Sequence, residues 1–238
     1  MRVAVLIPAY QAAAALGEVL MRLRALPDPP PVLVVDDGSR DGTADVARGA
    51  GARVVSFAGN RGKGHALIAG FAALSDHDAV ITLDADGQHP PECVPAFRAA
   101  AEAGADVVLG RRRFGPEMPA VRRVANRWSS WWATGIAGQA ISDSQCGYRL
   151  YRSAVLRAVP VTPGRYEVES EMAVRAARLG FRIAEVEIPT VYGAERSHVR
   201  PGSDVPRIVG TLARLSLECV APPPAMRAAL ARRARAPS

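Results

Sequence analysis

The sequence of 238 residues contains few cysteines and no long apolar run. Its three cysteines, Cys93, Cys146 and Cys219, form no CxxC pair, so the pattern supports neither a disulfide framework nor a zinc site. No window of about 20 residues is free of charge, and the apolar run at the start is too short for a signal peptide. We therefore expect a cytoplasmic protein without a membrane-spanning segment.

The turn after the first predicted strand, residues 3–7, contains no glycine. It reads Pro8-Ala-Tyr-Gln-Ala12, so its backbone cannot approach a pyrophosphate as a GxGxxG turn does, which argues against a dinucleotide dehydrogenase. The glycine-rich segment 59–64 is not a Walker A loop, because Gly64 follows Lys63 where Ser or Thr is needed. At a helix N-terminus Lys63 can still meet an anion, and the alternative is a solvated lysine in a glycine-rich turn.

The composition favours one large α/β domain with an anionic partner. Hydrophobic residues make up 49% of the chain, enough to bury a sizeable core. The formal charge is +7, which suggests a nucleotide, a lipid phosphate, a membrane surface or a nucleic acid as partner.

Predicted strands and helices alternate along the first half of the chain. Strands are expected at residues 3–7, 32–35, 53–57, 79–83 and 106–109, and helices at 13–25, from Thr43 as N-cap, at 62–74 and at 91–103. This order predicts a parallel sheet with right-handed crossovers, whose ligands bind at the carboxyl ends of the strands.

The second half is less regular. We expect a helix from the acidic segment 166–171 to residue 179, with structural glutamates in its first turn, then strands at 181–186 and 188–192 and a helix at 206–220. Residues 1–204 then form the main domain, and residues 205–238 form an amphipathic and basic helical tail.

Two carboxylates follow the apolar run 79–83. Side chains two residues apart in an extended segment point the same way, so Asp84 and Asp86 can converge on a hard cation, with Gln88 next in the series. The alternative is a loop that carries Asp-x-Asp as solvated turn formers. Since the pair stands at a predicted strand end, we favour a site for Mg²⁺ or Mn²⁺ with coordination positions left for phosphate oxygens.

Five motifs in order resemble family 2 glycosyltransferases of GT-A fold, over about residues 1–200. They are Ile7-Pro-Ala-Tyr10, Val34-Val-Asp-Asp-Gly-Ser39 with Asp41-Gly-Thr43, Asn60-Arg-Gly-Lys-Gly64, Asp84-Ala-Asp-Gly-Gln-His-Pro90 and Gly110-Arg-Arg112. The branch that they resemble most is that of the dolichyl- or polyprenyl-phosphate mannose and glucose synthases. The implied fold is a Rossmann-like, mostly parallel sheet flanked by helices, with a C-terminal helical appendage.

The resemblance also implies roles for individual residues. A GDP- or UDP-hexose donor would be bound by Pro8, Ala9, Tyr10, Val35, Asp37, Lys63, Asp84, Ala85, Arg196 and Arg200. The metal would be held by Asp84, Asp86 and Gln88. Asp143, Asp86 and Arg112 would be catalytic, with Arg112 on phosphate and Asp143 beside the reacting sugar, and Arg122 and Arg149 would bind the acceptor. A buried aspartate that caps a turn is the structural alternative for Asp143.

Six arginines between residues 111 and 127 precede all three tryptophans of the chain. Trp128, Trp131 and Trp132 have the spacing of one helical face, which either packs into the core or lies in a membrane interface with the arginines on lipid phosphates. From this order we expect peripheral association with the inner face of a membrane.

The expected reaction is an inverting transfer of a hexose to a polyprenyl phosphate, which is already anionic and needs no strong base. The alternative is a family 2 enzyme that acts on a saccharide hydroxyl, with Asp143 as base. A nucleic-acid-binding module is a remote alternative, because it leaves the acidic strand ends unexplained.

Overall fold

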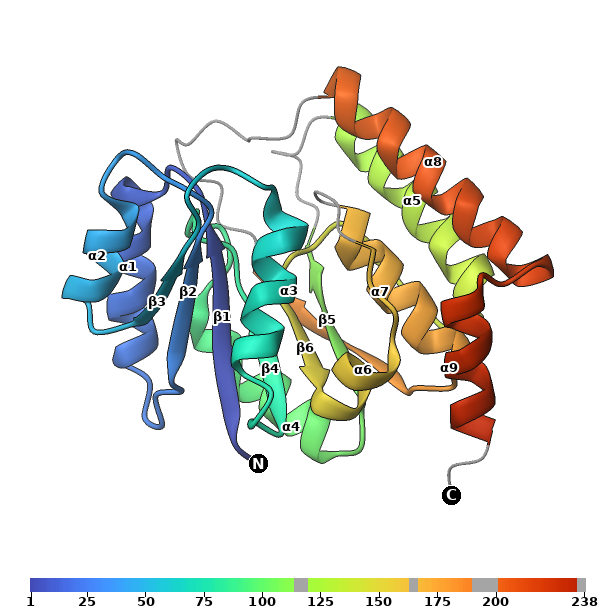
Figure 1. Cartoon of the computed structure of the whole chain (residues 1–238), viewed down its shortest axis with the longest axis horizontal. Helices are drawn as coiled ribbons and strands as arrows, with labels where there is room; N and C mark the ends of the chain where they lie inside the picture. The colour runs from blue at the N-terminus through green and yellow to red at the C-terminus, as the bar shows by residue number, and fades with distance from the viewer. Residues whose placement is uncertain (114–119, 163–166, 190–200, 235–238) are drawn as a thin grey trace.

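The computed structural model describes residues 1–113, 120–162, 167–189 and 201–234. Within this part, seven strands form one sheet in the order β3-β2-β1-β4-β6-β5-β7 (Figure 1). They are β1 Val3–Ala9, β2 Val32–Asp36, β3 Arg53–Ser56, β4 Ala79–Thr82, β5 Val107–Arg112, β6 Arg149–Arg152 and β7 Ile183–Ile188. All neighbouring pairs are parallel except the two that involve β6, which confirms the mostly parallel sheet.

Helices flank this sheet on both faces. They are α1 Ala13–Arg24, α2 Thr43–Gly49, α3 Lys63–Ala73, α4 Val94–Glu102 after the short 3-10 turn η1 Pro91–Cys93, α5 Ala120–Ala137, α6 Ser153–Ala158, α7 Glu167–Arg178, α8 Pro201–Val220 and α9 Pro224–Ala234. The predicted alternation of strand and helix up to β5 is thus confirmed.

The alternating side chains of β1 divide the core into two layers. Val3, Val5 and Ile7 belong to the core layer that contains residues of α1 and α4, whereas Ala4 and Leu6 belong to the layer that contains residues of α3 and α7. All of these side chains are buried, as expected for a strand in the middle of a sheet covered on both faces. The central strands are therefore held by packing on both faces of the sheet.

Three details of the prediction were wrong. Strand β6 was not predicted, and it runs antiparallel between β4 and β5. Strand β7 runs from Ile183 to Ile188, whereas we expected a strand at 181–186. Of the second strand expected at 188–192, only residue 188 lies in a strand, as the last residue of β7, and residues 190–192 lie outside the described part. The N-cap position of α2 is Gly42, with φ +86°, and Thr43 is the first helical residue. The carboxylate of Asp41, one residue before the N-cap, accepts the backbone N–H of Thr43 at 3.1 Å.

The C-terminal helices pack on the main body of the molecule. Figure 1 shows α5 and α8 side by side at one edge, and α8 also contacts α7. A buried ion-pair network joins α7 to α8, in which Arg175 pairs with Glu171 and with Glu218. The predicted boundary between residues 204 and 205 falls inside α8, and the two-part division stays a prediction. No helix in the described ranges is both long and apolar enough to cross a bilayer.

Candidate active site

The carboxyl ends of β2, β1 and β4 lie next to one another in the sheet (Figure 1). In the parallel register Pro8 is opposite Val35 and Ala9 is opposite Asp36, so the turns after β1 and β2 share one edge. Strand β4 is parallel to β1 on its other side and leads into Asp84 and Asp86 at that same edge. The turn Pro8-Ala9-Tyr10, the pair Asp36-Asp37 and the pair Asp84 and Asp86 therefore lie at one edge of the sheet, which we call the catalytic edge.

Asp37 shapes the loop that precedes α3. It is buried, and its two carboxylate oxygens accept the backbone N–H groups of Arg61 at 2.7 Å and Gly62 at 2.8 Å. Gly62 has φ +96°, a conformation that side chains other than hydrogen disfavour. Asp37 thus fixes the point at which α3 begins and places Lys63 in the first helical turn.

The ammonium of Lys63 lies between two carboxylates from different elements. Its Nζ is 2.6 Å from Oδ1 of Asp84, after β4, and 3.0 Å from Oε1 of Glu169, on α7. Burial by itself would lower the pKa of Lys63, but the two negative charges raise it. Burial would also raise the pKa of Asp84, yet the charge of Lys63 holds it at about 2. For Glu169, burial prevails over the attraction of Lys63 and raises the pKa.

The residues predicted to hold a metal form a compact turn. Oδ1 of Asp86 accepts the backbone N–H of Gln88 at 3.0 Å, and all three predicted ligands are half-buried. The carboxylate of Asp84 lies so close to Gly147 that a Cβ atom at position 147 would collide with it.

This donor set fits a hard cation. In the described residues no three His, Cys, Asp or Glu side chains cluster to enclose a metal alone. Two carboxylates and an amide leave positions open, as in sites where Mg²⁺ or Mn²⁺ is completed by phosphate oxygens. A residue larger than glycine at position 147 would fill the space next to Asp84.

A second ion pair joins the end of β5 to the segment before β6. Nε and Nη2 of Arg112 donate to the carboxylate of Asp143 at 2.7 and 3.0 Å, and Asn126 of α5 donates to it at 3.2 Å. Asp143 is buried, which would raise its pKa, but the bidentate contact with Arg112 lowers the pKa below its usual value. Asp143 also accepts the backbone N–H of Gln145, so the turn-capping role weighed from the sequence is present.

His89 lies beneath the Asp84 carboxylate. Its Nδ1 is 3.7 Å from Oδ2 of Asp84 and has no hydrogen-bond partner, although the ring is buried. Burial lowers the pKa of His89 to about 4, so the imidazole is neutral at pH 7. A neutral ring leaves the charge of Asp84 to be balanced by Lys63.

The residues predicted to hold the nucleoside differ in what they offer. Tyr10 is 46% exposed at the end of β1 and is accessible to a base or ribose. Val35 is fully buried, backbone included, and is paired in the sheet with both β1 and β3, so it can only support a nucleoside site from within the core. Pro8, Ala9 and Ala85 are buried as well and can contribute shape and backbone groups.

Arg149 does not fit the predicted contact with the acceptor. It is completely buried in β6, and its guanidinium donates to the backbone carbonyls of Cys146, Ser144 and Glu169. An arginine whose three guanidinium nitrogens all donate to backbone carbonyls stabilises the protein interior and is not exposed to an acceptor. The predicted donor contacts Arg196 and Arg200 lie outside the described residues, as does the side chain of Arg122.

The sequence did not predict two residues that contact Lys63 and Asp84 at this edge of the sheet, Glu169 and Gly147. Glu169 was read as structural because acidic residues are common in the first turn of a helix, and only the packing of α7 brings it to Lys63. Gly147 had a weaker signal, a lone glycine before Tyr148, with nothing to indicate that Asp84 packs against it.

The tryptophans divide between core and surface. Trp132 is half-buried, packs against the core and donates from Nε1 to Oγ of Ser216 on α8 at 3.0 Å. Trp131 is 74% exposed and Trp128 is 44% exposed, with the ring of Trp128 edge-on to Trp132. Neither of the two readings from the sequence, all core or all interface, therefore describes the helix.

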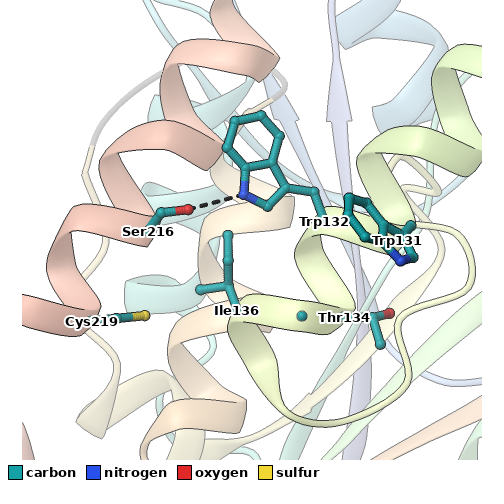
Figure 2. Close-up of a pocket in the computed structure, with 7 residues that line it drawn as sticks. Trp131, Trp132, Thr134, Ile136, Ser216 and Cys219 are labelled. Atoms are coloured by element: carbon teal, nitrogen blue, oxygen red, sulfur yellow. Dashed lines mark hydrogen bonds between the residues drawn. The ribbon is translucent and has the colours of Figure 1, made fainter.

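Exposed apolar side chains lie on both α5 and α8, which pack against each other. We call these side chains together the α5–α8 face: Val124, Trp128 and Trp131 on α5, and Leu217 and Val220 on α8. A hollow of about 420 Å³ lies between the two helices and is lined in part by Trp131. Figure 2 shows Trp132 and Ile136 of α5 turned toward Ser216 and Cys219 of α8, with Trp131 further from α8. Arg127, also on α5, is exposed close to this surface.

Comparisons with known proteins agree with the motifs and the geometry. A family model described as Glycosyl transferase family 2 matches residues 4–159. An undecaprenyl-phosphate mannosyltransferase of Micrococcus luteus is 37% identical over 205 residues, which cover 80% of this chain and 84% of that protein. A dolichyl-phosphate hexose transferase of Haloferax volcanii is 30% identical over 218 residues, 90% of this chain and 94% of that protein.

Solved structures show the same fold. Glucosyl-3-phosphoglycerate synthase from Mycobacterium tuberculosis in complex with UDP superposes with a TM-score of 0.75 at 26% identity, over 90% of this chain and 79% of that one. The same synthase has been solved with UDP and Mn²⁺ or Mg²⁺. The expected GT-A fold is confirmed, and this chain, which carries the family's motifs on one edge of that fold, belongs to glycosyl transferase family 2.

Proposed function

We propose that this glycosyltransferase moves a hexose from a GDP- or UDP-sugar to a polyprenyl phosphate at a membrane surface. Two relatives of similar length are named as transferases to undecaprenyl phosphate and to dolichyl phosphate. The observation that carries the proposal for this chain is the state of Asp143, which is buried, pinned by Arg112 and has a lowered pKa. A carboxylate held in this way is a poor general base, whereas a phosphate acceptor is already an anion and needs none.

The residues at the edge divide the work of an inverting displacement. Asp84, Asp86 and Gln88 would hold Mg²⁺ or Mn²⁺, which offsets the charge that grows on the leaving nucleoside diphosphate. Lys63, at the start of α3, adds a second positive charge at the same edge. Two hydrogen bonds to Asp143 orient the guanidinium of Arg112, whose positive charge suits a phosphate of the donor or acceptor. The acceptor oxygen would attack C1 of the sugar in line with the departing diphosphate.

The α5–α8 face supports the membrane part of the proposal. Trp128 and Trp131 stand out from the same helix that sends Asn126 inward to Asp143, so the helix links an apolar surface to the reaction centre. Indoles partition to the headgroup region of a bilayer, and nearby arginine adds attraction to anionic lipids. Two other arginines of the predicted basic segment are used differently: Arg111 and Arg113 pair with Glu187 on β7. The donor would come from the cytoplasm and the acceptor from the membrane plane.

A screen of donors and acceptors tests the function. UDP- and GDP-hexoses are offered with Mg²⁺ or Mn²⁺ to a short polyprenyl phosphate, to a water-soluble saccharide, and to phosphoglyceric acid, which the mycobacterial synthase binds. We expect transfer to the polyprenyl phosphate with one of the two nucleotides. Transfer to the saccharide or to phosphoglyceric acid but not to the lipid would contradict the proposed acceptor.

A further inference from the structure

Three charged groups at the catalytic edge differ in how far solvent reaches them. The side chain of Asp84 is 25% exposed, that of Lys63 is 15% exposed and that of Glu169 is 4% exposed. A cation from solution can therefore reach Asp84 more readily than Glu169. The ion pair that Glu169 forms in this cluster is with Lys63, so Lys63 is the group through which we expect Glu169 to act on a bound metal or diphosphate.

We propose that Glu169 is a positioning residue, which holds Lys63 at the diphosphate edge and limits how strongly Lys63 competes with a divalent cation for Asp84. The proposal rests on the proposed use of a metal and a nucleoside diphosphate. It concerns only residues of this chain, and its test does not depend on the identity of the acceptor.

The geometry explains why two carboxylates are needed. Oδ1 of Asp84, 2.6 Å from Lys63, is one of the oxygens that a metal would use. Without Glu169, the Lys63 ammonium would be attracted more strongly to Oδ1 of Asp84, and a metal would have to displace it from that oxygen. Glu169, 3.0 Å away on the other side, shares the charge of Lys63 and keeps the ammonium in place when Asp84 turns to a metal.

Glu169 itself is fixed in position. Val168, Met172 and Ala173 of α7 are packed in the core. The backbone carbonyl of Glu169 also accepts Nη1 of the buried Arg149. A carboxylate on so rigid a support can hold the flexible lysine chain in one place. This gives Arg149, which the sequence assigned to the acceptor, a role behind the site.

The test measures Mn²⁺ binding without donor or acceptor, from the electron paramagnetic resonance signal of free Mn²⁺. In Glu169→Gln, Lys63 loses the carboxylate that shares its charge with Asp84, and we expect the dissociation constant for Mn²⁺ to rise about tenfold, the factor given by 1.4 kcal/mol. In Lys63→Gln, the competitor is gone, and we expect it to fall by about the same factor. The opposite signs separate competition from a general loss of structure.

Three further variants complete the design. Glu169→Asp keeps the charge on a shorter chain and should give an intermediate Mn²⁺ affinity. In the double variant Lys63→Gln/Glu169→Gln, affinity should stay within about threefold of Lys63→Gln, because Glu169 acts through Lys63. Glu171→Gln is the matched control: Glu171 is equally buried on α7 but pairs with Arg175, so its loss should lower the melting temperature and leave Mn²⁺ affinity unchanged.

Steady-state kinetics provide a second measurement. Glu169→Gln should raise the KM for the nucleotide sugar more than it lowers kcat at saturating metal, since Lys63 is drawn away from the donor before the reaction begins. A folded Glu169→Gln with wild-type Mn²⁺ affinity and donor KM would overturn the proposal. Were that variant not to fold, unchanged Mn²⁺ affinity in Lys63→Gln would overturn it equally.

The outcome is independent of the acceptor. A chain that transfers sugar to a soluble acceptor and still shows the two opposite shifts would contradict the lipid assignment and support the role of Glu169. A wild type that binds no Mn²⁺ even with GDP or UDP present would overturn both.

Discussion

Removal of the two exposed indoles, in the double variant Trp128→Ala/Trp131→Ala, should detach the protein from membranes without unfolding it. An indole side chain presents about 200 Å², and exposed fractions of 44% and 74% leave roughly 240 Å² in contact with water. If a bilayer covers half of this area at about 25 cal/mol per Å², the pair contributes about 3 kcal/mol. The partition coefficient into anionic vesicles should then fall roughly 100-fold.

Cosedimentation with liposomes of increasing anionic lipid content, run beside a thermal melt, measures both effects. The melting temperature of the double variant should fall by only a few degrees, for the lost edge-on contact of Trp128 with Trp132. Trp132→Ala is the contrasting variant, because it removes a half-buried ring and its hydrogen bond to Ser216. That change should cost about 2 kcal/mol of stability, or about 5 °C.

Met21→Ala is the matched control for an exposed apolar side chain elsewhere. Met21 is 64% exposed on α1, on the far side of the molecule from the α5–α8 face (Figure 1). Its replacement should alter neither binding nor melting. Wild-type vesicle binding by the double variant, or a wild type that never sediments with anionic liposomes, would refute the assignment of this face.

Three other predictions concern the catalytic edge. Asp86→Ala should abolish transfer while the protein stays folded, because loss of a metal ligand removes several kcal/mol of charge stabilisation in the transition state. Excess EDTA should abolish transfer by the wild type in the same way, and full activity in EDTA would exclude a metal. Asp37→Ala should raise the donor KM more than it lowers kcat, and an unchanged KM with a reduced kcat would exclude a role in donor binding. The same change should cost about 1–3 kcal/mol of stability, because the N–H groups of Arg61 and Gly62 lose their acceptor. The pKa of Asp143 is lowered in the folded protein, so its ionised carboxylate stabilises the fold fully above the unfolded-state pKa of about 3.9 and loses this effect as the pH falls through the folded-state pKa. The melting temperature of Asp143→Asn should therefore fall less steeply with decreasing pH than that of the wild type. An equally steep fall would contradict the pairing of Asp143 with Arg112.

The sequence alone determined the catalytic edge of the sheet. Apolar runs of four or five residues followed by Asp36-Asp37 and by Asp84 and Asp86 are local signals, and parallel strands place their carboxyl ends together whatever the details of packing. The motifs are local signals as well, since each occupies a few consecutive residues at a strand end or, for Asn60-Arg-Gly-Lys-Gly64, at the start of α3.

Tertiary structure decided everything that depends on contacts between distant segments. Strand β6 is defined by antiparallel pairing with β4 and β5, a partnership that no local period reports. The position of Glu169 against Lys63 depends on how α7 packs, and the complete burial of Arg149 follows from the carbonyls that surround it. Helical spacing put three tryptophans on one side of α5, but only the position of α8 decided that Trp132 is covered and Trp131 is left at the surface.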